Sequence, residues 1–570
     1  MADTVAIPVS KIRRPRPVPK GRPVDPVARE EIARLLEGAP LDSQYLIENL
    51  HRIQDRYGHL SAAHLNALAE LMKLAQTEVY EVATFYHHFD VVKEGEKAPP
   101  KVTVRVCETL SCAMAGAQQL LEKLPKLLGP DVRVIAAPCI GRCAEAPAVC
   151  VGHNAFGHAT EQGVVKAVKE NKLEPPAPQA HGYADYRAQG GYKTWVECVT
   201  GKRDVESVIK TMEDSALRGL GGAGFPVGRK WRIVRGEPAP RLMAVNIDEG
   251  EPGTFKDRHY LERDPHRFLE GMLIAAWAVG IDDIYVYLRD EYHACRALLE
   301  REIAALKADP PAVAEGRAGK QTSLPNIHLR RGAGAYICGE ESAMIESIEG
   351  KRGMPRLRPP YVAQVGLFGR PTLEHNMETL FWVRDLLEQG AAWFTKHGRH
   401  DRKGLRSFSV SGRVKKPGVH LAPAGITVKE LIDEYCGGMP DGHRFYAYLP
   451  GGASGGILPA SLGDIPLDFD TLQPHGCFIG SAAVIVLSDQ DKARDAALNL
   501  MKFFEHESCG QCTPCRVGTA KAAQLMESKK WDRKLLEELS QAMADASICG
   551  LGQAAPNPIL MVAKHFPDEI

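Results

Sequence analysis

Two different periods of apolar residues alternate along the chain, and they predict several domains of different class. Between residues 26 and 90 the period is helical. The two apolar faces are formed by Leu46, Leu50, Ile53 and Tyr57, and by Leu65, Leu68, Met72 and Ala75. Asp42 or Ser43 is a suitable N-cap for the first helix, Ser61 for the second, and Gly58 a suitable stop between them. We therefore expect a helical domain at residues 26–95.

Strand-like and helical patterns then alternate over residues 96–172. Val102, Val104 and Val106 alternate as in a half-buried strand, and Val132 to Ile135 form a second short strand. The stretch from Ala113 to Leu128 between them has a helical pattern. This order predicts a small α/β domain.

The remainder of the chain divides at a proline-rich stretch. Residues 173–195 begin with a run of prolines and continue with glycine and tyrosine, which is typical of a linker. Residues 196–403 again alternate helix and strand, residues 404–490 are β-rich with Pro-Gly turns, and residues 491–570 are helical. The fold class that we expect is a multidomain α/β and α+β protein.

Composition sets limits on the partners. A chain of 570 residues suggests about four domains, and its net charge of zero gives no reason to expect a nucleic acid. The apolar run Gly271–Ile281 is too short to span a bilayer, so we expect a cytoplasmic protein without direct membrane insertion. Residues 1–25 carry basic side chains among prolines but no apolar core. We expect an extended basic arm, either a solvated tail or a clip onto a partner subunit.

A glycine-rich loop is the strongest candidate for nucleotide binding. Five glycines, at 219, 221, 222, 224 and 228, lie within ten residues, so backbone N–H groups can approach a phosphate or a flat ring. The preceding residues 205–218 have helical spacing, which excludes a simple Rossmann unit because that unit needs a strand there. A structural turn is the alternative, and a second glycine run, Gly451–Gly456, is expected to be such a turn.

Eight of the fourteen cysteines form two groups. Cys107-x4-Cys112 and Cys139-x3-Cys143 each follow a predicted strand, so four thiolates can converge on one iron–sulfur cluster or one zinc ion. Cys509, Cys512 and Cys515 form a C-x2-C-x2-C run that the distant Cys549 completes, which is typical of a [4Fe–4S] site; a zinc or disulfide knot is the alternative. The isolated thiols are expected to be small buried side chains: Cys150, Cys198, Cys295, Cys338, Cys436 and Cys477.

The glycine loop, the run Asn246–Pro252 and the later Gly339-Glu340-Glu341 together resemble one known family. It is the flavin-bearing, NADH-binding subunit of respiratory complex I, with its relatives in soluble NAD-dependent formate dehydrogenases and NAD-reducing hydrogenases. Residues up to 172 resemble the thioredoxin-like [2Fe–2S] subunit of the same enzymes. The chain thus looks like a fusion of two polypeptides. The resemblance implies a thioredoxin-like [2Fe–2S] domain at 96–172, an FMN/NAD-binding domain at 196–403, a ubiquitin-like (soluble-ligand-binding β-grasp) domain at 404–490 and a helical [4Fe–4S] domain at 491–570.

The same resemblance implies the residues of each site. For FMN they are Gly219, Gly221, Gly222, Lys230, Asn246, Asp248, Glu249, Gly339, Glu340, Glu341, His375, Asn376 and Thr379. For NAD they are Gly224, Phe225, Glu251, Glu341, Arg358 and Tyr361. One [2Fe–2S] cluster would use Cys107, Cys112, Cys139 and Cys143, and one [4Fe–4S] cluster Cys509, Cys512, Cys515 and Cys549. The chain departs from the family pattern at His375, where asparagine is usual, and at Tyr361 and Ile233.

These cofactors predict an NADH-linked diaphorase. A flavin exchanges hydride with nicotinamide and single electrons with clusters, and direct hydride transfer needs no catalytic acid or base. The chain as a whole looks most like the β subunit of a soluble NAD-dependent formate dehydrogenase, whose partner is a catalytic α subunit with a molybdenum or tungsten pterin cofactor and further iron–sulfur clusters. The alternatives are the diaphorase subunit of an NAD-reducing hydrogenase, fused complex I subunits, and a colourless zinc-binding scaffold without enzyme activity.

Overall fold

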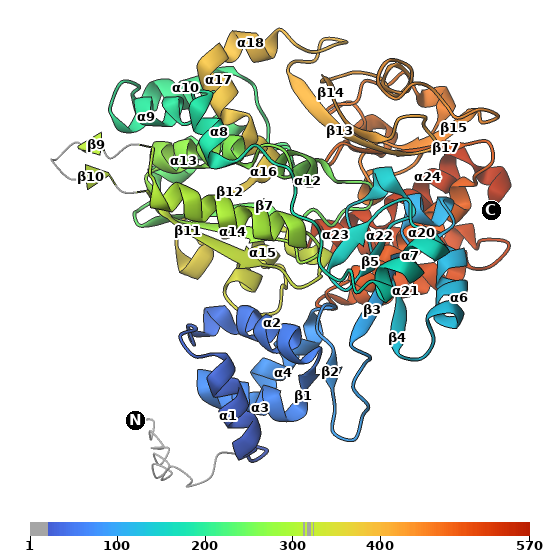
Figure 1. The fold of residues 1–570 in the computed structure, drawn as a ribbon. Coiled ribbons are helices and arrows are strands. Elements are labelled where there is room, and N and C mark those ends of the chain that lie inside the picture. The colour runs from blue at the N-terminus through green and yellow to red at the C-terminus, as the bar shows by residue number, and fades with distance from the viewer. Residues whose placement is uncertain (1–20, 312–313, 316–320, 323) are drawn as a thin grey trace, which may run out of the picture.

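The computed structural model describes residues 21–311, 314–315, 321–322 and 324–570 (Figure 1). The expected basic arm lies outside them, apart from its last five residues. Within the described residues the elements form helical, mixed and parallel-sheet units, which confirms the multidomain α/β and α+β fold class. In this part of the chain, helices long and apolar enough to cross a bilayer are absent.

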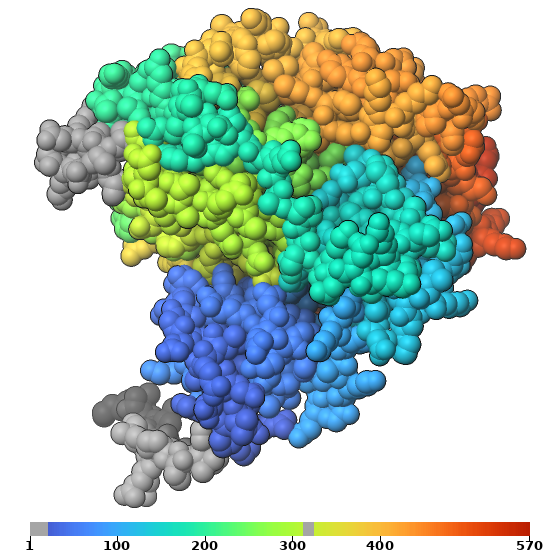
Figure 2. Space-filling model, viewed as in Figure 1, coloured from blue at the N-terminus to red at the C-terminus, as the bar shows by residue number. Residues whose placement is uncertain are grey.

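Four helices form the N-terminal unit, drawn in blue in Figures 1 and 2. They are α1 (Pro26–Leu35), α2 (Leu46–Tyr57), α3 (Ala62–Met72) and α4 (Gln76–Phe85). The predicted signals are confirmed at two ends: Gly58 ends α2 at φ 75°, and the Ser61 side chain accepts from the N–H of His64. The unit is fixed to the rest of the chain by buried contacts, among them Tyr86 Oη to Ser347 Oγ at 2.9 Å and His51 Nε2 to Gly332 O at 2.8 Å.

The next unit is a four-stranded sheet with strand order β4-β3-β5-β6. Its elements are β3 (Val102–Cys107), α5 (Leu110–Met114), α6 (Ala117–Leu128), β4 (Val132–Ala137), β5 (Val149–Val151), β6 (Asn154–Phe156) and α7 (Glu161–Lys169). The single helix that we predicted from Ala113 to Leu128 is wrong. It is split at Gly116, whose φ of 90° ends one helical segment and starts the next. The short α5 carries Cys112.

The central unit is a parallel sheet with strand order β11-β8-β7-β12. Its strands are β7 (Arg241–Ile247), β8 (Ile281–Leu288), β11 (Asn326–Arg331) and β12 (Thr372–Asn376). Helices α11 (Val227–Gly236), α13 (Pro265–Val279) and α14 (His293–Ala308) share one apolar core with it, and α15 (Glu341–Ile348) belongs to the core on the other face. The carboxyl ends of all four parallel strands meet at one edge, so the loops that follow them lie together there.

The stretch expected to be a linker, 173–195, contains helix α8 (Tyr183–Ala188) and leads into α9 (Lys193–Val199). Both are tied to the central unit by Glu270 of α13, whose side chain is fully buried. Glu270 accepts from Tyr186 Oη at 2.7 Å, from the N–H of Tyr192 at 2.8 Å and from the N–H of Trp195 at 3.2 Å. One carboxylate thus fixes the entry of the chain into the central unit.

The C-terminal third consists of a mixed sheet and a helical unit, orange and red in Figure 1. The sheet has strand order β14-β13-β17-β15-β16, from β13 (Leu405–Gly412), β14 (Gly418–Pro423), β15 (Phe445–Leu449), β16 (Leu458–Pro459) and β17 (Ala483–Ser488). The helices are α20 (Ala493–Glu507), α21 (Thr513–Met526), α22 (Arg533–Ala546), α23 (Gly550–Ala554) and α24 (Asn557–His565). Figure 2 shows the thioredoxin-like unit (cyan to teal) packed beside both the N-terminal helices and this C-terminal region.

Replacing Glu270 tests how the chain enters the central unit. Glu270→Ala leaves two buried backbone N–H groups and the Tyr186 hydroxyl without an acceptor, so we expect it to lower the free energy of unfolding by about 3 kcal/mol. Scanning calorimetry of the purified protein measures this as an earlier unfolding transition. Glu300→Ala, on the exposed side of α14, is the control and should leave the transition unchanged; equal transitions for both variants would contradict the anchoring role.

Candidate functional site

The glycine loop connects α10 (Val205–Asp214) to α11 and lies at the carboxyl edge of the central sheet. The N–H of Gly219 donates to Phe225 O at 2.9 Å, and the N–H of Leu220 donates to Thr379 Oγ1 at 2.9 Å. A Cβ on Gly221 would lie 2.9 Å from Cβ of Asn376, so a side chain at this position would force the loop away from β12. Glycine is therefore required by close packing, as the phosphate-loop interpretation predicts.

Asn246 and Asn376 end two neighbouring strands and are directly paired in the sheet register. The Asn246 amide donates to Gly339 O at 2.8 Å, which brings the Gly339-Glu340-Glu341 loop to this edge. The Asn376 amide donates to Asp257 Oδ2 at 2.7 Å, and the buried Lys256 donates to Asn376 Oδ1 at 3.3 Å. The structure thus brings together the glycine loop and three loops that are distant in sequence.

Asp248 carries the clearest sign of a missing polar partner. Its Oδ2 atom is buried, and it has no hydrogen-bond partner among the described residues. Burial raises the pKa of this carboxyl well above its usual range. A Cβ on Gly339 would lie 3.7 Å from Oδ2, so the absence of a side chain there keeps the space beside the oxygen open. A buried acceptor facing a glycine loop fits the polar edge of a flavin, and the predicted FMN set passes this test.

A group of charged side chains lies at the rim of the same edge. Lys230 Nζ donates to Glu374 O at 3.0 Å and lies 3.4 Å from Glu374 Oε2. Arg358 forms ion pairs with Glu340 and, at 2.8 Å, with Glu341. Burial, followed by the nearby Glu374, raises the pKa of Glu341. Glu374 was missed by the sequence analysis, although the alternation along β12 places it on the same side as Asn376.

His375 is the one predicted FMN residue whose side chain the structure does not bring to this group. It lies between Glu374 and Asn376 in β12, so its side chain points to the opposite face of the sheet. There its Nε2 accepts from Trp231 Nε1 at 2.8 Å, and burial lowers the pKa of the imidazole well below its usual range. The replacement of the family asparagine by His375 is therefore accommodated in the helix-facing core.

Two of the predicted acidic contacts have their oxygens engaged within the protein. Glu249 accepts from the N–H groups of Asp257 at 2.8 Å and Arg258 at 3.2 Å, and from Tyr292 Oη at 2.8 Å. Burial and the neighbouring Asp257 raise its pKa to about 7. Glu340 caps α15 through the N–H groups of Ser342 and Ala343. Both carboxylates fix the start of a helix beside the site.

The predicted NAD residues lie at the surface opening of this edge. Phe225 is 38% exposed and Tyr361 is 57% exposed, so both rings are available to a planar ligand. Glu251 lies deeper: its Oε1 accepts from the N–H of Ser454 at 2.8 Å and from Ser454 Oγ at 2.7 Å, and its Oε2 accepts from Tyr336 Oη. Tyr336 and Ser454 are further residues that the sequence analysis missed. The turn at 451–456 is structural, as expected, and it holds Glu251.

The four thiols of the first cysteine group converge. Cys107, Cys112, Cys139 and Cys143 are 1–3% exposed, and the Cys139 and Cys143 sulfurs are 3.3 Å apart. The thiols of Cys112 and Cys139 raise the pKa of Cys107. Four buried thiols from two loops fit one metal cluster. Their loops contact every later unit: Arg258 donates to Gly141 O at 3.0 Å, Ser111 and Ser411 hydroxyls are 2.9 Å apart, and Asn499 donates to Glu108 O at 2.9 Å.

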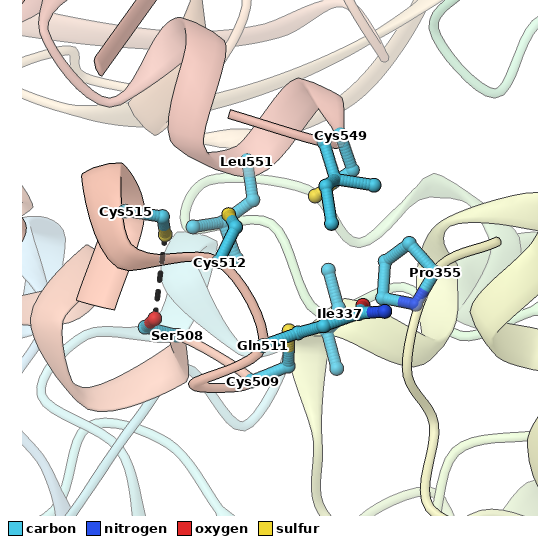
Figure 3. Close-up of a pocket in the computed structure, with 10 residues that line it drawn as sticks. Ile337, Pro355, Ser508, Cys509, Gln511, Cys512, Cys515, Cys549 and Leu551 are labelled. Carbon is cyan, nitrogen blue, oxygen red and sulfur yellow. Dashed lines mark hydrogen bonds between the residues drawn. The ribbon is translucent and has the colours of Figure 1, made fainter. Parts of the chain in front are cut away.

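The second cysteine group lines one pocket (Figure 3). Cys509 and Cys512 precede α21, Cys515 lies in its first turn and Cys549 precedes α23. Figure 3 shows their sulfurs around a common space that Ile337 and Pro355 close on one side. Four thiols without a disulfide between them fit a [4Fe–4S] cluster. All six isolated cysteines are buried, as predicted.

One short helical turn joins the two sites. In the turn Tyr336–Gly339, Tyr336 donates to Glu251, Ile337 lines the cysteine pocket, and Gly339 accepts from Asn246. The N–H of Tyr336 also donates to the buried Glu507, two residues before Cys509, at 2.9 Å. Neighbouring residues of one turn therefore contact the nucleotide site and the cluster site, so the two sites are adjacent.

Comparison with protein families gives the same division. Residues 32–172 match the thioredoxin-like [2Fe–2S] ferredoxin family, residues 212–385 the Nuo51 FMN-binding domain, residues 407–458 the SLBB domain, and residues 495–570 the NADH-ubiquinone oxidoreductase-F iron–sulfur binding region. These matches establish FMN, [2Fe–2S] and [4Fe–4S] as the cofactors.

Individual relatives cover the chain to different extents. An F-type NADH-quinone oxidoreductase subunit of Rhizobium meliloti (strain 1021) is 40% identical over 399 residues, which are 69% of this chain and 94% of that protein. The corresponding protein of Aquifex aeolicus (strain VF5) is 40% identical over 69% of this chain and 91% of its own length. A chain of NAD+-reducing [NiFe]-hydrogenase in the air-oxidized state is 30% identical, with a TM-score of 0.80 and 92% of both chains covered.

Removing one thiol of the second group tests its role as a ligand set. Cys512→Ser should abolish the [4Fe–4S] signal in electron paramagnetic resonance and prevent electron transfer beyond the flavin, because one of four ligands is lost. Cys150→Ser is the matched control: the Cys150 thiol donates to Gly152 O at 3.2 Å, which a hydroxyl can also do. An intact [4Fe–4S] signal in Cys512→Ser would refute the ligand assignment.

Replacing the carboxylate of Glu251 tests the NAD contact. In Glu251→Gln the amide nitrogen cannot accept, so one of the bonds from Ser454 or Tyr336 is lost and the loop at 248–254 shifts. We expect the KM for NADH to rise about tenfold with unchanged FMN content. Steady-state kinetics with ferricyanide and flavin absorbance measure the two quantities. Loss of bound FMN would instead assign Glu251 to the flavin.

Proposed function

Because this chain belongs to the family of F-type NADH-quinone oxidoreductase subunits, we propose that it is the NAD+-reducing β subunit of a molybdenum- or tungsten-dependent formate dehydrogenase. Family membership makes it an oxidoreductase subunit with FMN, [2Fe–2S] and [4Fe–4S] cofactors. The proposed overall reaction is formate + NAD+ to CO2 + NADH. Formate would be oxidised in a separate α subunit that carries the pterin cofactor and further iron–sulfur clusters.

The turn Tyr336–Gly339 is the observation that carries the diaphorase part of this proposal. It contacts Glu251 and Asn246 on one side and contributes Ile337 to the cysteine pocket on the other. When bound, FMN supplies the exchange between hydride and single electrons that the clusters carry. The residues of this edge position the ligands and keep water out, and none of them needs to transfer a proton.

We assign the side chains and glycines of the edge as follows. The glycine loop, Asn246, Asp248, Asn376 and Thr379 would hold FMN, with Lys230 near its phosphate. Phe225 and Tyr361 would stack on the dinucleotide, and Glu251, Glu341 and Arg358 would contact its polar groups. The acidic rim at Glu340, Glu341 and Glu374 disfavours an additional phosphate on the adenosine ribose, so NAD is preferred to NADP.

Two kinds of observation bear on the partner subunit. The fused arrangement of a [2Fe–2S] unit and an FMN unit in one chain supports a soluble dehydrogenase of the formate type. A hydrogenase partner is the second candidate, since the likeness to the chain of NAD+-reducing [NiFe]-hydrogenase extends over 92% of both chains. Fused subunits of complex I are the third candidate, because the sequence relatives are subunits of NADH-quinone oxidoreductase.

Isolation of the native complex through a tag on this chain distinguishes these candidates. We expect NAD+ reduction with formate, together with molybdenum or tungsten in the metal analysis. NAD+ reduction with hydrogen, together with nickel, would replace the formate proposal by the hydrogenase one. Activity with neither substrate, but continued NADH-dependent reduction of ferricyanide, would refute the formate proposal and leave the diaphorase assignment intact.

A further inference from the structure

Three residues of the β-rich unit reach across to the glycine loop of the nucleotide site. We name Asp468–Asp470, in the loop between β16 and β17, the clamp segment. The Phe469 ring is 5% exposed and lies between two guanidinium groups. Arg218 is 4.4 Å and Arg406 is 4.2 Å from its centroid. Cation–π contacts from two sides hold the ring in one orientation.

Arg218 joins the clamp segment to the glycine loop directly. Its Nε donates to Gly224 O, and its Nη1 forms an ion pair with Asp470 Oδ2 at 2.7 Å. One planar group therefore contacts the loop backbone, the Phe469 ring and the Asp470 carboxylate together. Any movement of the clamp segment changes the support of Gly224.

The Phe469 ring also limits the glycine loop sterically. A Cβ on Gly224 would lie 2.6 Å from Cδ1 and 2.8 Å from Cζ of the ring, closer than van der Waals contact allows. Gly224 also has a φ of 65°, in the left-handed region. The loop thus follows the ring surface so closely that only glycine fits.

The clamp segment is itself fixed from behind by the β-rich unit. Arg402 Nε donates to Asp468 Oδ2 at 2.7 Å and its Nη2 to Phe469 O at 2.8 Å. Arg406 Nη2 donates to Asp468 Oδ1 at 2.8 Å. These charge-assisted bonds form without a ligand, so the segment is a preformed support.

We propose that Phe469 is a positioning residue for the dinucleotide, holding Gly224 and Phe225 in the conformation that receives NADH. The β-rich unit thereby takes part in nucleotide binding without contacting the nucleotide itself. The inference rests on the proposed NADH-binding role of the glycine loop and is independent of the partner subunit. Its test therefore uses ferricyanide as acceptor, and its outcome is separate from the formate assay.

The first measurement is made on the full chain with its cofactors. Phe469→Ala should raise the KM for NADH about tenfold while kcat falls much less, because the loop is misplaced and the cofactors remain. FMN absorbance and both cluster signals should be unchanged. The control is Leu421→Ala, an exposed apolar residue of β14 in the same unit, which should leave the KM unchanged. An unchanged KM in Phe469→Ala would overturn the proposal.

A double-mutant cycle separates positioning from a general loss of packing. Gly224→Ala carries the same backbone strain in both backgrounds, but only in the presence of Phe469 does its methyl group meet the ring. The rise in KM caused by Gly224→Ala should therefore be about tenfold smaller in the Phe469→Ala background. An equal rise in both backgrounds would overturn the proposal. If Phe469→Ala fails to fold, the same cycle is measured with Phe469→Leu, which keeps apolar volume and removes the ring.

Discussion

The carboxylate of Glu251 is the interaction on which the arrangement of the domains depends most. It lies in the loop after β7, accepts two bonds from Ser454 of the β-rich unit and one from Tyr336, and Ser454 O in turn accepts from Asn557 of α24 at 2.9 Å. Burial raises the pKa of Glu251, while the bonds from Tyr336 and Ser454 oppose that rise. A half-buried carboxylate is stable there only with these donors in place, so three units must meet in one geometry.

Sequence patterns were most informative where ligands are close in the chain. The spacing of Cys509, Cys512 and Cys515, and the strand that leads to Cys107, are local features that survive folding unchanged. The sequence also indicated the edge of the sheet, because Asn246 and Asn376 end strands that are neighbours in a parallel sheet. Local signals were insufficient where one residue breaks a pattern, as Gly116 does between α5 and α6.

Contacts between distant segments could not be read from the sequence in the same way. Glu249 and Glu340 have the residue type of ligand contacts, yet their oxygens accept from the first N–H groups of α12 (Lys256–Leu261) and α15. Ser454 lies 203 positions after Glu251 in the sequence and acquires its role only because hydrogen bonds join the two residues in space. Resemblance transfers a residue's type, and the fold decides which of its atoms remain available.

The enclosure of the first cysteine group has a consequence for the order of events during synthesis. Its last thiol, Cys143, leaves the ribosome long before Arg258, Ser411 and Asn499, which cover its loops in the finished protein. For the time needed to translate the intervening chain, these thiols are made but not yet enclosed. Iron and sulfide can be delivered in that interval without reopening a folded structure. The second group has the opposite order, because Ile337 and Pro355, which close its pocket, are made before any of its four thiols.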